Sequence, residues 1–233
     1  MIAILMSAGL GTRMKPLTDK VAKPLVKVFN KSMIETIIDG LEGVVSHIYI
    51  VVGYKKEQFT FLKEKYNNVT LIENKEYQTI NNISSIHAVR DIMGKDDCFI
   101  CEADLYISDT SIFKDKLDTS CYYGVYVQGH SDDWVFDQDE NGLITRVGKY
   151  GDNKYNMCGI SFFKAHDAKI IKKAIDEAYK KIGKFENLYW DDIVNMNLNK
   201  LKLKVHPVLR EQIIEIDTLL ELEAFDKGYR EYN

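Results

Sequence analysis

The first 25 residues constrain the fold of this chain more than any other stretch. Residues 1–6 are a short, continuous apolar run, which is typical of a buried strand in a parallel sheet. The run breaks at Ser7, and the segment from Ser7 to Gly11 has almost no side-chain bulk. Small residues let backbone N–H groups approach an anion closely. We therefore predict an anion-binding turn at the carboxyl end of the first strand.

Cationic side chains follow this turn at Arg13, Lys15 and Lys23. A bare turn with nearby cations at the edge of a sheet is suited to a polyphosphate. Gly9 and Gly11 lack the Gly-Lys-Ser/Thr ending of the Walker A loop and supply only part of the dinucleotide fingerprint. On spacing alone, the turn also fits an ordinary strand-to-loop connection.

Composition narrows the possible partners. The 233 residues carry a formal net charge of −4, so there is no global basic field for nucleic acid, and local cations must hold an anionic substrate. No apolar run approaches the roughly 20 residues of a membrane-spanning helix. The first residues also lack the basic leader of a signal peptide. We expect a cytoplasmic protein without a membrane partner.

Short apolar runs alternate with helical patterns through the first half of the chain. This βαβαβαβ pattern predicts an α/β fold with a doubly wound, mostly parallel (mixed) sheet of the Rossmann-like type. We expect a single domain over 1–233, with a β-rich second half from residue 111 onward. The expected strands are 1–6, 47–53, 69–72, 98–103, 121–128, 134–137, 143–147, 156–163, 203–208 and 213–216. The expected helices are 34–45, 57–66, 82–93, 165–182, 188–198 and 217–229.

Four cysteines are present, and two of them, Cys98 and Cys101, have the spacing of half a zinc ribbon or of a redox motif. Both lie in an apolar run, and no second Cys-x-x-Cys occurs. We therefore interpret them as buried thiols of a core strand.

Two aspartates end apolar runs in the predicted sheet region. Asp104 follows the run 98–103, and Asp217 follows the run 213–216. Residues just past strand ends line the ligand crevice of an open parallel sheet. Mg²⁺ takes one or two carboxylates in such places, together with water and phosphate oxygens. The alternatives are a solvated turn for Asp104 and a helix N-cap for Asp217.

Polar side chains open the helix before the strand 98–103. Amide and hydroxyl groups at such a position can cap the helix, or they can hydrogen-bond to a base edge or a phosphate. The residue types leave both interpretations open. The side chains concerned are Asn81, Asn82, Ser84 and Ser85.

The full opening string is far more specific than its glycines. Ser-Ala-Gly-Leu-Gly-Thr-Arg-Met-Lys-Pro-Leu-Thr, followed by Ala-Lys-Pro-Leu, resembles the signature of the sugar-phosphate nucleotidyltransferase superfamily. The resemblance implies that the loop wraps the triphosphate of a nucleotide. It also implies catalytic roles for Lys23, which would contact phosphate oxygens during transfer, and for Arg13. The residues implied to bind the triphosphate are Ala8, Gly9, Gly11, Thr12, Arg13 and Lys23.

The same resemblance implies a catalytic Mg²⁺ held by Asp104 and Asp217, which match the positions of the metal-binding aspartates. It places the polar segment with Asn81, Asn82, Ser84 and Ser85 close to the base. The Asn81-Asn82 pair, after Asn-Lys-Glu-Tyr, is similar to that of bacterial CTP:phosphocholine cytidylyltransferases. Many sugar-nucleotide relatives carry a glycine before the first aspartate, where this chain has Glu-Ala-Asp, which points away from a hexose-1-phosphate enzyme.

The two tryptophans of the chain lie among carboxylates in the second half. Aromatic faces and negative charge hold a quaternary ammonium, which has no N–H donor. The position of Trp134 matches an aromatic that the phosphocholine enzymes use against choline. Core packing is the alternative for each ring, and adjacent helical residues point in different directions. The candidate acceptor-binding residues are Trp134, Tyr189, Trp190, Asp191 and Glu215.

The resemblance therefore implies an enzyme that transfers CMP from CTP to phosphocholine, giving CDP-choline and pyrophosphate, with Mg²⁺ as cofactor. Its partners would be CTP and a small phosphorylated amino alcohol, and it would act as a monomer or homodimer. Residues 1–110 would mainly bind the nucleotide, and residues 111–233 the acceptor.

Three rival functions remain. A CTP:2-aminoethylphosphonate or other amino-alkyl phosphate cytidylyltransferase would hold a primary ammonium with carboxylates rather than rings. A sugar-1-phosphate nucleotidyltransferase would favour hydroxyl-reading side chains. A nucleotide-sensing or scaffold protein without turnover is disfavoured, because Lys23, Asp104 and Asp217 are all present.

Overall fold

A seven-stranded sheet forms the centre of the computed structural model, which describes residues 1–181 and 183–233. Its strand order is β10-β8-β9-β6-β1-β4-β5. These strands are β1 (Ile2–Ser7), β4 (His47–Val52), β5 (Val69–Glu73), β6 (Cys98–Glu102), β8 (Cys121–Gln138), β9 (Ile144–Phe163) and β10 (Lys204–Pro207). Two small ribbons consist of β2 (Lys27–Val28) with β3 (Lys31–Ser32), and of β7 (Leu105–Ile107) with β11 (Ile213–Glu215).

Six α-helices and several 3-10 turns connect the strands of the described residues. The helices are α1 (Met33–Leu41), α2 (Phe61–Lys65), α3 (Ile83–Ala88), α4 (Ala165–Tyr179), α5 (Trp190–Asn195) and α6 (Leu219–Phe225). The 3-10 turns are η1 (Thr12–Met14), η2 (Leu17–Asp19), η3 (Lys23–Leu25), η4 (Lys56–Phe59), η5 (Thr110–Phe113), η6 (Leu198–Lys200) and η7 (Tyr229–Glu231).

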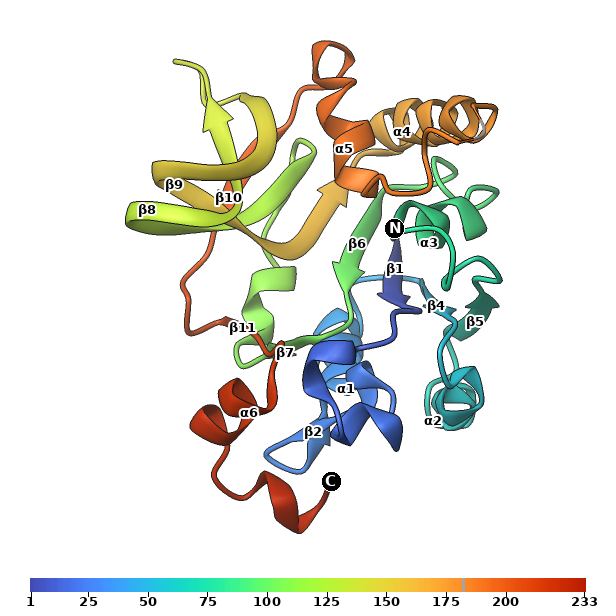
Figure 1. Ribbon diagram of the computed structural model, residues 1–233. Helices are drawn as coiled ribbons and strands as arrows, with labels where there is room; N and C mark the ends of the chain where they lie inside the picture. Colours follow the sequence, from blue (N-terminus) through green and yellow to red (C-terminus); the bar gives the residue numbers. More distant parts are fainter. Residues whose placement is uncertain (182) are drawn as a thin grey trace.

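The N-terminal half is a doubly wound parallel sheet with β1 among its inner strands. β1 pairs in parallel with β4 on one side and with β6 on the other, and β4 pairs in parallel with β5. Alternate side chains of β1 enter two cores. Ala3 and Leu5 share a core with α1, whereas Ile2 and Ile4 share a core with α3, α4 and α5. Helices thus cover both faces of the sheet (Figure 1), and the predicted Rossmann-like fold class is confirmed.

β8 and β9 form one long, bent hairpin where four short strands were predicted. They are 18 and 20 residues long, and several register shifts interrupt their antiparallel pairing. Val135 lies opposite both Gly148 and Asn156, so the hairpin curls back on itself. The polar stretches that resembled turns are therefore bends within continuous strands, because register shifts add curvature without reversing the chain. Figure 1 shows the hairpin rising to one side of the parallel strands.

Several helices are shorter than their apolar patterns predicted. α1 ends at Leu41, two residues before Gly43, whose φ of +73° is incompatible with a continuing helix. α3 forms only the first part of its predicted stretch, and hydrogen-bonded turns follow it. Of the predicted helix 165–182, α4 forms the part up to Tyr179, and residue 182 lies outside the described residues. Among the described residues, no helix has the length and apolar character needed to cross a membrane.

The ribbon of β7 and β11 brings two distant segments together. β7 follows β6 almost directly, and β11 pairs with it antiparallel, with Glu215 opposite Leu105. Asp104 precedes β7 and Asp217 follows β11, so this pairing places the two aspartates near one another. β11 was predicted as a strand, whereas the short β7 was not.

The four cysteines are free and buried, as the apolar context of Cys98 and Cys101 predicted. Burial raises the pKa of the Cys98 thiol to about 12. At neutral pH this side chain is therefore a protonated, apolar core group.

Candidate functional site

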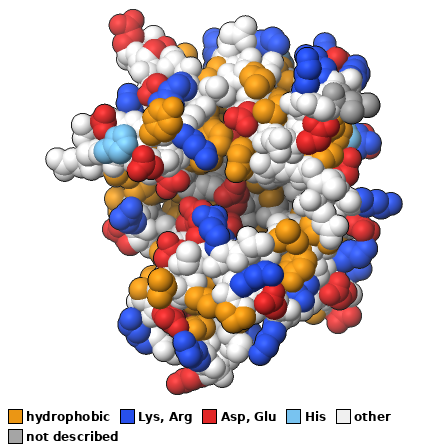
Figure 2. All heavy atoms as spheres, in the orientation of Figure 1, with side chains coloured by type: hydrophobic (Ala, Val, Ile, Leu, Met, Phe, Trp, Pro, Cys, Tyr) orange, Lys and Arg blue, Asp and Glu red, His pale blue; other side chains and the backbone are white. Residues whose placement is uncertain are grey.

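A cavity of about 310 Å³ opens at the carboxyl end of β1, and we name it the loop cavity. Figure 2 shows a hollow on this face, with acidic and basic side chains gathered at its centre. All residues that the resemblance assigned to the triphosphate line it, so the fold brings them together. They are Ala8, Gly9, Gly11, Thr12, Arg13 and Lys23.

The loop after β1 turns sharply at Gly11, whose φ of +61° is a conformation that L side chains rarely adopt. A Cβ at this position would lie 2.8 Å from Lys23 Cβ and 3.1 Å from Thr18 Cγ2. Thr18 Oγ1 also donates a hydrogen bond to the Gly11 carbonyl at 2.8 Å. The bare backbone at Gly11 therefore lets Lys23 pack directly against the loop. Gly9 instead has open space where a Cβ would lie.

Lys23 lies at the centre of the charged groups of the loop cavity. Its Nζ donates to Asp104 Oδ2 and to Asp217 Oδ1, each at 2.6 Å. Arg13 Nη1 lies 2.8 Å from Asp217 Oδ2. The side chain of Lys23 is only 9% exposed, whereas that of Arg13 is 69% exposed. Lys23 is thus an enclosed cation between two carboxylates, and Arg13 is an exposed cation at the rim, paired with Asp217.

The pKa of Lys23 is raised above its usual value. Burial acts to lower this pKa, but the charges and hydrogen bonds of Asp104 and Asp217 outweigh burial. Lys23 therefore stays protonated at neutral pH, as a group that stabilises phosphate oxygens must.

Neither aspartate serves the structural role that its sequence position also allowed. Thr218, rather than Asp217, is the N-cap of α6, and it exchanges hydrogen bonds with Glu221 in a capping box. The side chain of Asp217 is directed to Lys23 and Arg13 instead. Asp104 is held by Lys23 and has a side chain that is 25% exposed, so it is more than a solvated turn residue.

The polar segment before β6 divides between the cavity and the scaffold. Asn82 and Ser85 line the loop cavity. Ser84 is buried and donates a hydrogen bond to the Asn81 carbonyl at 2.8 Å, while the Asn81 side chain donates to the Asn187 carbonyl at 3.2 Å. Asn81 and Ser84 therefore stabilise the surrounding loops, which differs from the base-contacting role that the resemblance implied.

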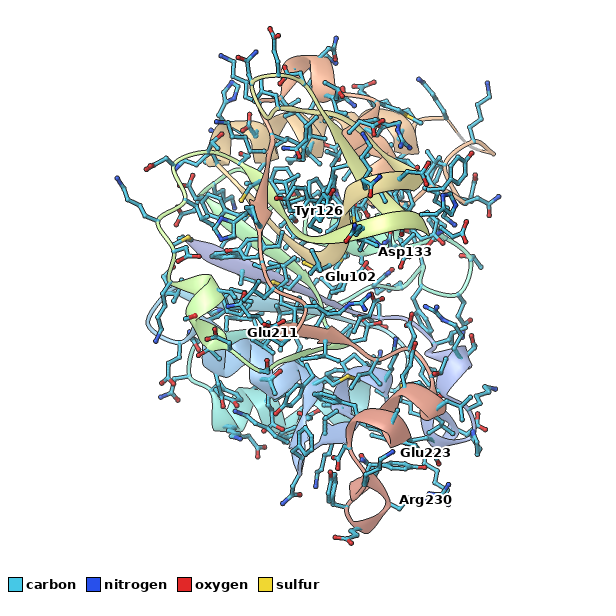
Figure 3. The ribbon with its side chains drawn as sticks, turned by 90° about the vertical axis from the view of Figure 1, so that its left-hand side faces the viewer. Glu102, Tyr126, Asp133, Glu211, Glu223 and Arg230 are labelled. Carbon is cyan, nitrogen blue, oxygen red and sulfur yellow. The ribbon has the colours of Figure 1, made fainter. Side chains whose placement is uncertain are left out.

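A second cavity, the hairpin cavity, lies beneath the β8–β9 hairpin and has a volume of about 260 Å³. Arg13, Glu102, Glu215 and Asp217 line both cavities, so the two are adjacent. In Figure 3 the labels of Glu102 and Asp133 mark this region of the molecule. The residues that line the hairpin cavity but not the loop cavity include Asp132, Asp133, Trp134, Lys149, Tyr189 and Asp191.

Trp134 and Tyr189 form an aromatic wall of the hairpin cavity. Their ring centroids are 5.4 Å apart, and the rings meet edge to face at 69°. Trp190 points the other way, is only 3% exposed, and packs against Tyr122 and Phe163. The ring of Trp190 is therefore part of the core, which corrects its predicted place against the acceptor. Tyr189 is the member of the adjacent pair that faces the cavity.

Carboxyl groups dominate the hairpin cavity, where six of them face two cationic side chains. Burial, reinforced by the charge of Asp104, raises the pKa of Glu215 to about 7. Burial also raises the pKa of Asp191 to about 7, although the Tyr122 hydroxyl donates to it at 2.9 Å. Burial and the neighbouring carboxylates raise the pKa of Glu102 well above its usual range. Such crowding favours a ligand that brings positive charge.

Several lining residues had no role assigned from the sequence, and three of them are polar or charged residues that bear on the chemistry. Ser7 is 2% exposed and lines the loop cavity, yet its hydroxyl has no hydrogen-bond partner among the described residues. The sequence drew attention to Glu102 only as part of the Glu-Ala-Asp stretch, which differs from the pattern of many sugar-nucleotide relatives. Lys149 had no local signal at all, because the curl of the β8–β9 hairpin alone brings it to the cavity.

A Rossmann-like sheet, a glycine loop, a buried lysine and paired aspartates together define a protein built to bind and transfer a nucleotide phosphate. Comparison with known proteins agrees, because residues 2–121 match the family described as nucleotidyl transferase. The chain belongs to this nucleotidyltransferase family and is an enzyme, which confirms the superfamily predicted from the opening string.

Similar proteins extend over almost the whole chain. This chain is 51% identical over 228 residues to a 2-aminoethylphosphonate cytidylyltransferase of Lancefieldella rimae. The aligned region covers 97% of this chain and 92% of that protein. It is 33% identical over 234 residues to a choline-phosphate cytidylyltransferase of Streptococcus pneumoniae, covering 100% of both. A choline-phosphate cytidylyltransferase of Haemophilus influenzae is 32% identical over 221 residues, with 94% and 93% covered.

Solved structures resemble the fold closely. The CTP:phosphocholine cytidylyltransferase from Streptococcus pneumoniae superposes with a TM-score of 0.88 at 33% identity, covering 97% of this chain and 98% of that one. A putative glucose-1-phosphate thymidylyltransferase from Bacillus anthracis has a TM-score of 0.77 at 17% identity, with 100% and 97% covered. The second likeness concerns the fold alone.

Proposed function

We propose that this enzyme transfers CMP from CTP to 2-aminoethylphosphonate and releases pyrophosphate. The observation that carries the proposal is the hairpin cavity, which six carboxyl groups line, Asp217 among them, next to Lys23 and Asp104 of the loop cavity. A primary ammonium has three N–H donors, and carboxylate oxygens are strong acceptors for them. The relative at 51% identity supports the same acceptor. This reverses the order predicted from the sequence, which placed phosphocholine first.

Phosphocholine is the second candidate acceptor. Its trimethylammonium group has no N–H donor and needs aromatic faces, which Trp134 and Tyr189 offer in the hairpin cavity. The two relatives at 33% and 32% identity support this candidate. A sugar 1-phosphate has less support, because it brings no positive charge to the crowded carboxyl groups.

The proposed reaction joins the two cavities. A phosphonate oxygen of the acceptor attacks the α-phosphorus of CTP in line, and a P–O–P bond forms. The bond from the α-phosphorus to the bridging oxygen of the β-phosphate breaks, and pyrophosphate leaves with the electron pair. An ionised phosphonate is already a nucleophile, so no side chain needs to act as a base.

The chain's own residues supply positioning and charge. In the proposed reaction, Lys23 Nζ stabilises negative charge that develops on the α-phosphate oxygens. Arg13, exposed at the rim, binds the β- and γ-phosphates in the proposed reaction, together with backbone N–H groups of the loop. The carboxyl groups of the hairpin cavity orient the acceptor through its ammonium, and Lys149 offers a cation for its phosphonate.

The paired aspartates fit one Mg²⁺. Asp104 Oδ2 and Asp217 Oδ1 converge within 2.6 Å of a single ammonium, so both already face a common cation. The described residues contain no cluster of three or more His, Cys, Asp and Glu side chains suited to a metal. Two carboxylates completed by water and phosphate oxygens are nevertheless a set that Mg²⁺ uses. When bound, Mg²⁺ would neutralise charge on the phosphate oxygens.

An acceptor panel tests the proposal. The purified protein is incubated with CTP, Mg²⁺ and one acceptor at a time, and pyrophosphate release is measured with mass analysis of the product. The panel contains 2-aminoethylphosphonate, phosphoethanolamine, phosphocholine and glucose 1-phosphate, and a Lys23→Ala preparation controls for contaminating activity. We expect the highest kcat/KM with 2-aminoethylphosphonate. Turnover of phosphocholine with an inert 2-aminoethylphosphonate would overturn the first choice of acceptor.

A further inference from the structure

Asn82 reaches the elements of both cavities. Its side chain lines the loop cavity beside Ser85. Its Oδ1 accepts a hydrogen bond from the backbone N–H of Trp190 at 2.9 Å, across 108 residues of sequence. Trp190 is the first residue of α5 and directly follows Tyr189, which stands in the aromatic wall of the hairpin cavity. One amide therefore lies between the nucleotide cavity and the acceptor wall.

The hydrogen bond to Trp190 fixes the orientation of the Asn82 amide. A backbone N–H can only donate, so the amide oxygen must face it. The NH₂ group of Asn82 is then the end left for the loop cavity. This group donates hydrogen bonds, and acceptor atoms are plentiful on a nucleotide.

The start of α5 depends on partners outside the helix. The first N–H groups of any α-helix have no acceptor within the helix. In α5, the Trp190 N–H is satisfied by Asn82, while the Asp192 side chain accepts from the Tyr189 N–H at 2.9 Å. α5 is only six residues long, so a loosened first turn would carry Tyr189 with it.

Neighbouring hydrogen bonds also join the two segments. The Asn81 N–H donates to the Glu186 carbonyl at 2.8 Å, and the Asn81 side chain donates to the Asn187 carbonyl at 3.2 Å. The Asn82 N–H in turn donates to Asn81 Oδ1 at 2.7 Å. Several hydrogen bonds thus link the start of α3 to the residues just before α5. Asn82 makes one of these links and also lines the loop cavity.

We propose that Asn82 is a positioning residue that couples the two substrate sites. A nucleotide that hydrogen-bonds to the NH₂ group fixes the amide, and the amide oxygen then holds the start of α5 with Tyr189 in the acceptor wall. The acceptor consequently binds more tightly after the nucleotide than before it. This inference rests on the proposed function, because it assumes CTP in the loop cavity and a cationic acceptor in the hairpin cavity.

Calorimetric titration tests the coupling. The Kd of 2-aminoethylphosphonate is measured with Mg²⁺, first without nucleotide and then with saturating α,β-methylene-CTP, which cannot release pyrophosphate. For the wild-type protein we expect a Kd lower by roughly fivefold or more when the nucleotide is present. Phosphocholine replaces the acceptor in the same design if the acceptor panel favours it.

Two substitutions at Asn82 break the link at different ends. Asn82→Asp keeps an oxygen for the Trp190 N–H but removes the NH₂ group, so acceptor affinity without nucleotide stays near wild type while the enhancement by nucleotide falls. Asn82→Ala removes both ends, so acceptor affinity falls even without nucleotide. Ser85→Ala is the matched control, because Ser85 lines the loop cavity and its hydroxyl accepts a hydrogen bond from the Asn74 side chain instead of from α5. It should weaken nucleotide binding and keep the enhancement at saturation.

The outcomes separate this inference from the proposed function. An enhancement in both Asn82 variants equal to that of the wild type overturns the coupling and leaves the proposed function standing. Wild-type protein that binds neither CTP analogue nor acceptor overturns the proposed function itself. Circular dichroism and melting temperature confirm that each variant is folded. If Asn82→Ala does not fold, loss of the enhancement in Asn82→Asp alone still carries the test.

Discussion

Lys23 Nζ lies 2.6 Å from Asp217 Oδ1, although 194 residues separate them in the sequence. The same ammonium lies 2.6 Å from Asp104 Oδ2, so one buried cation joins the first loop, the end of β6 and the end of β11. A charge held in this way is rigid before any ligand arrives. Electrostatic stabilisation of a transition state depends on such preorganisation, because no reorientation is then needed during the reaction.

Replacing Lys23 with alanine should lower kcat by about 10²–10³-fold, which is typical for the loss of one preorganised group that stabilises transition-state charge. The measurement is the steady-state rate of pyrophosphate release at saturating CTP and acceptor. Lys20→Ala is the matched control, since Lys20 is an exposed lysine close in sequence. A Lys23→Ala enzyme with a kcat near that of the wild type would remove Lys23 from the chemistry.

The two loop glycines should respond differently to alanine. Gly11→Ala combines a φ of +61° with a Cβ that would lie 2.8 Å from Lys23 Cβ, so we expect a lower melting temperature and a strong loss of kcat. Gly9→Ala meets open space and should keep the melting temperature. Because that space lies in the loop cavity, Gly9→Ala should raise the KM for CTP. Equal melting temperatures for both variants would contradict the packing assigned to Gly11.

Local sequence was sufficient to predict the loop cavity. The loop, the lysine and the strand before them lie within 25 residues, and the apolar run of β1 leaves few alternatives for the backbone there. Asp104 was also predictable, because it ends an apolar run and parallel strands end at one edge of a sheet. Asp217 ends an apolar run as well, but it lies beside Asp104 because β11 pairs antiparallel with β7. The sequence alone did not exclude helix capping as the role of Asp217. The capping box between Thr218 and Glu221 in the structure excludes it.

The hairpin cavity was much less predictable, because it depends on long-range pairing. The register shifts of β8 and β9 decide where Lys149 lies, and no local pattern around residue 149 encodes them. Trp190 was assigned to the acceptor on residue type, whereas the direction of its ring follows from how α5 packs on Tyr122. Apolar residues do recur at helical spacing over 82–93. Hydrogen-bonded turns can also bring residues of this spacing to one side, and such turns follow α3.

Removal of divalent cations should abolish turnover, and added Mg²⁺ should restore it. Asp104→Asn and Asp217→Asn each remove one carboxylate that faces Lys23, so we expect a higher Mg²⁺ concentration at half-maximal rate and a lower kcat. The measurement is the rate of pyrophosphate release across a Mg²⁺ titration. Asp139→Asn, which alters a distant hairpin turn, is the control. Undiminished turnover in excess chelator would contradict the proposed metal site.

The aromatic wall and the carboxylates should contribute differently to the two candidate acceptors. Trp134→Leu removes an aromatic face, and we expect kcat/KM to fall more for phosphocholine than for 2-aminoethylphosphonate. Asp133→Asn removes a charge and should reduce use of 2-aminoethylphosphonate more strongly. The measurement is the ratio of kcat/KM for the two acceptors in each variant. The same ratio in both variants would mean that ring and carboxylate do not discriminate between the acceptors.

The stability of the folded enzyme without ligands should fall as pH rises through the range in which Asp191 titrates. Burial raises the pKa of this carboxyl from 3.8 to about 7, so the folded chain holds a proton that the unfolded chain releases above pH 4. The favourable contribution is complete below about pH 4 and is lost as pH approaches 7; its size is at most on the order of 4 kcal/mol. Urea unfolding at several pH values measures it. Asp191→Asn should make the profile less steep between pH 4 and 7, where Glu215 still contributes, whereas Asp118→Asn, at an exposed position, should leave the slope unchanged. Parallel profiles for wild type and Asp191→Asn would show that Asp191 is ionised throughout this range in the folded protein.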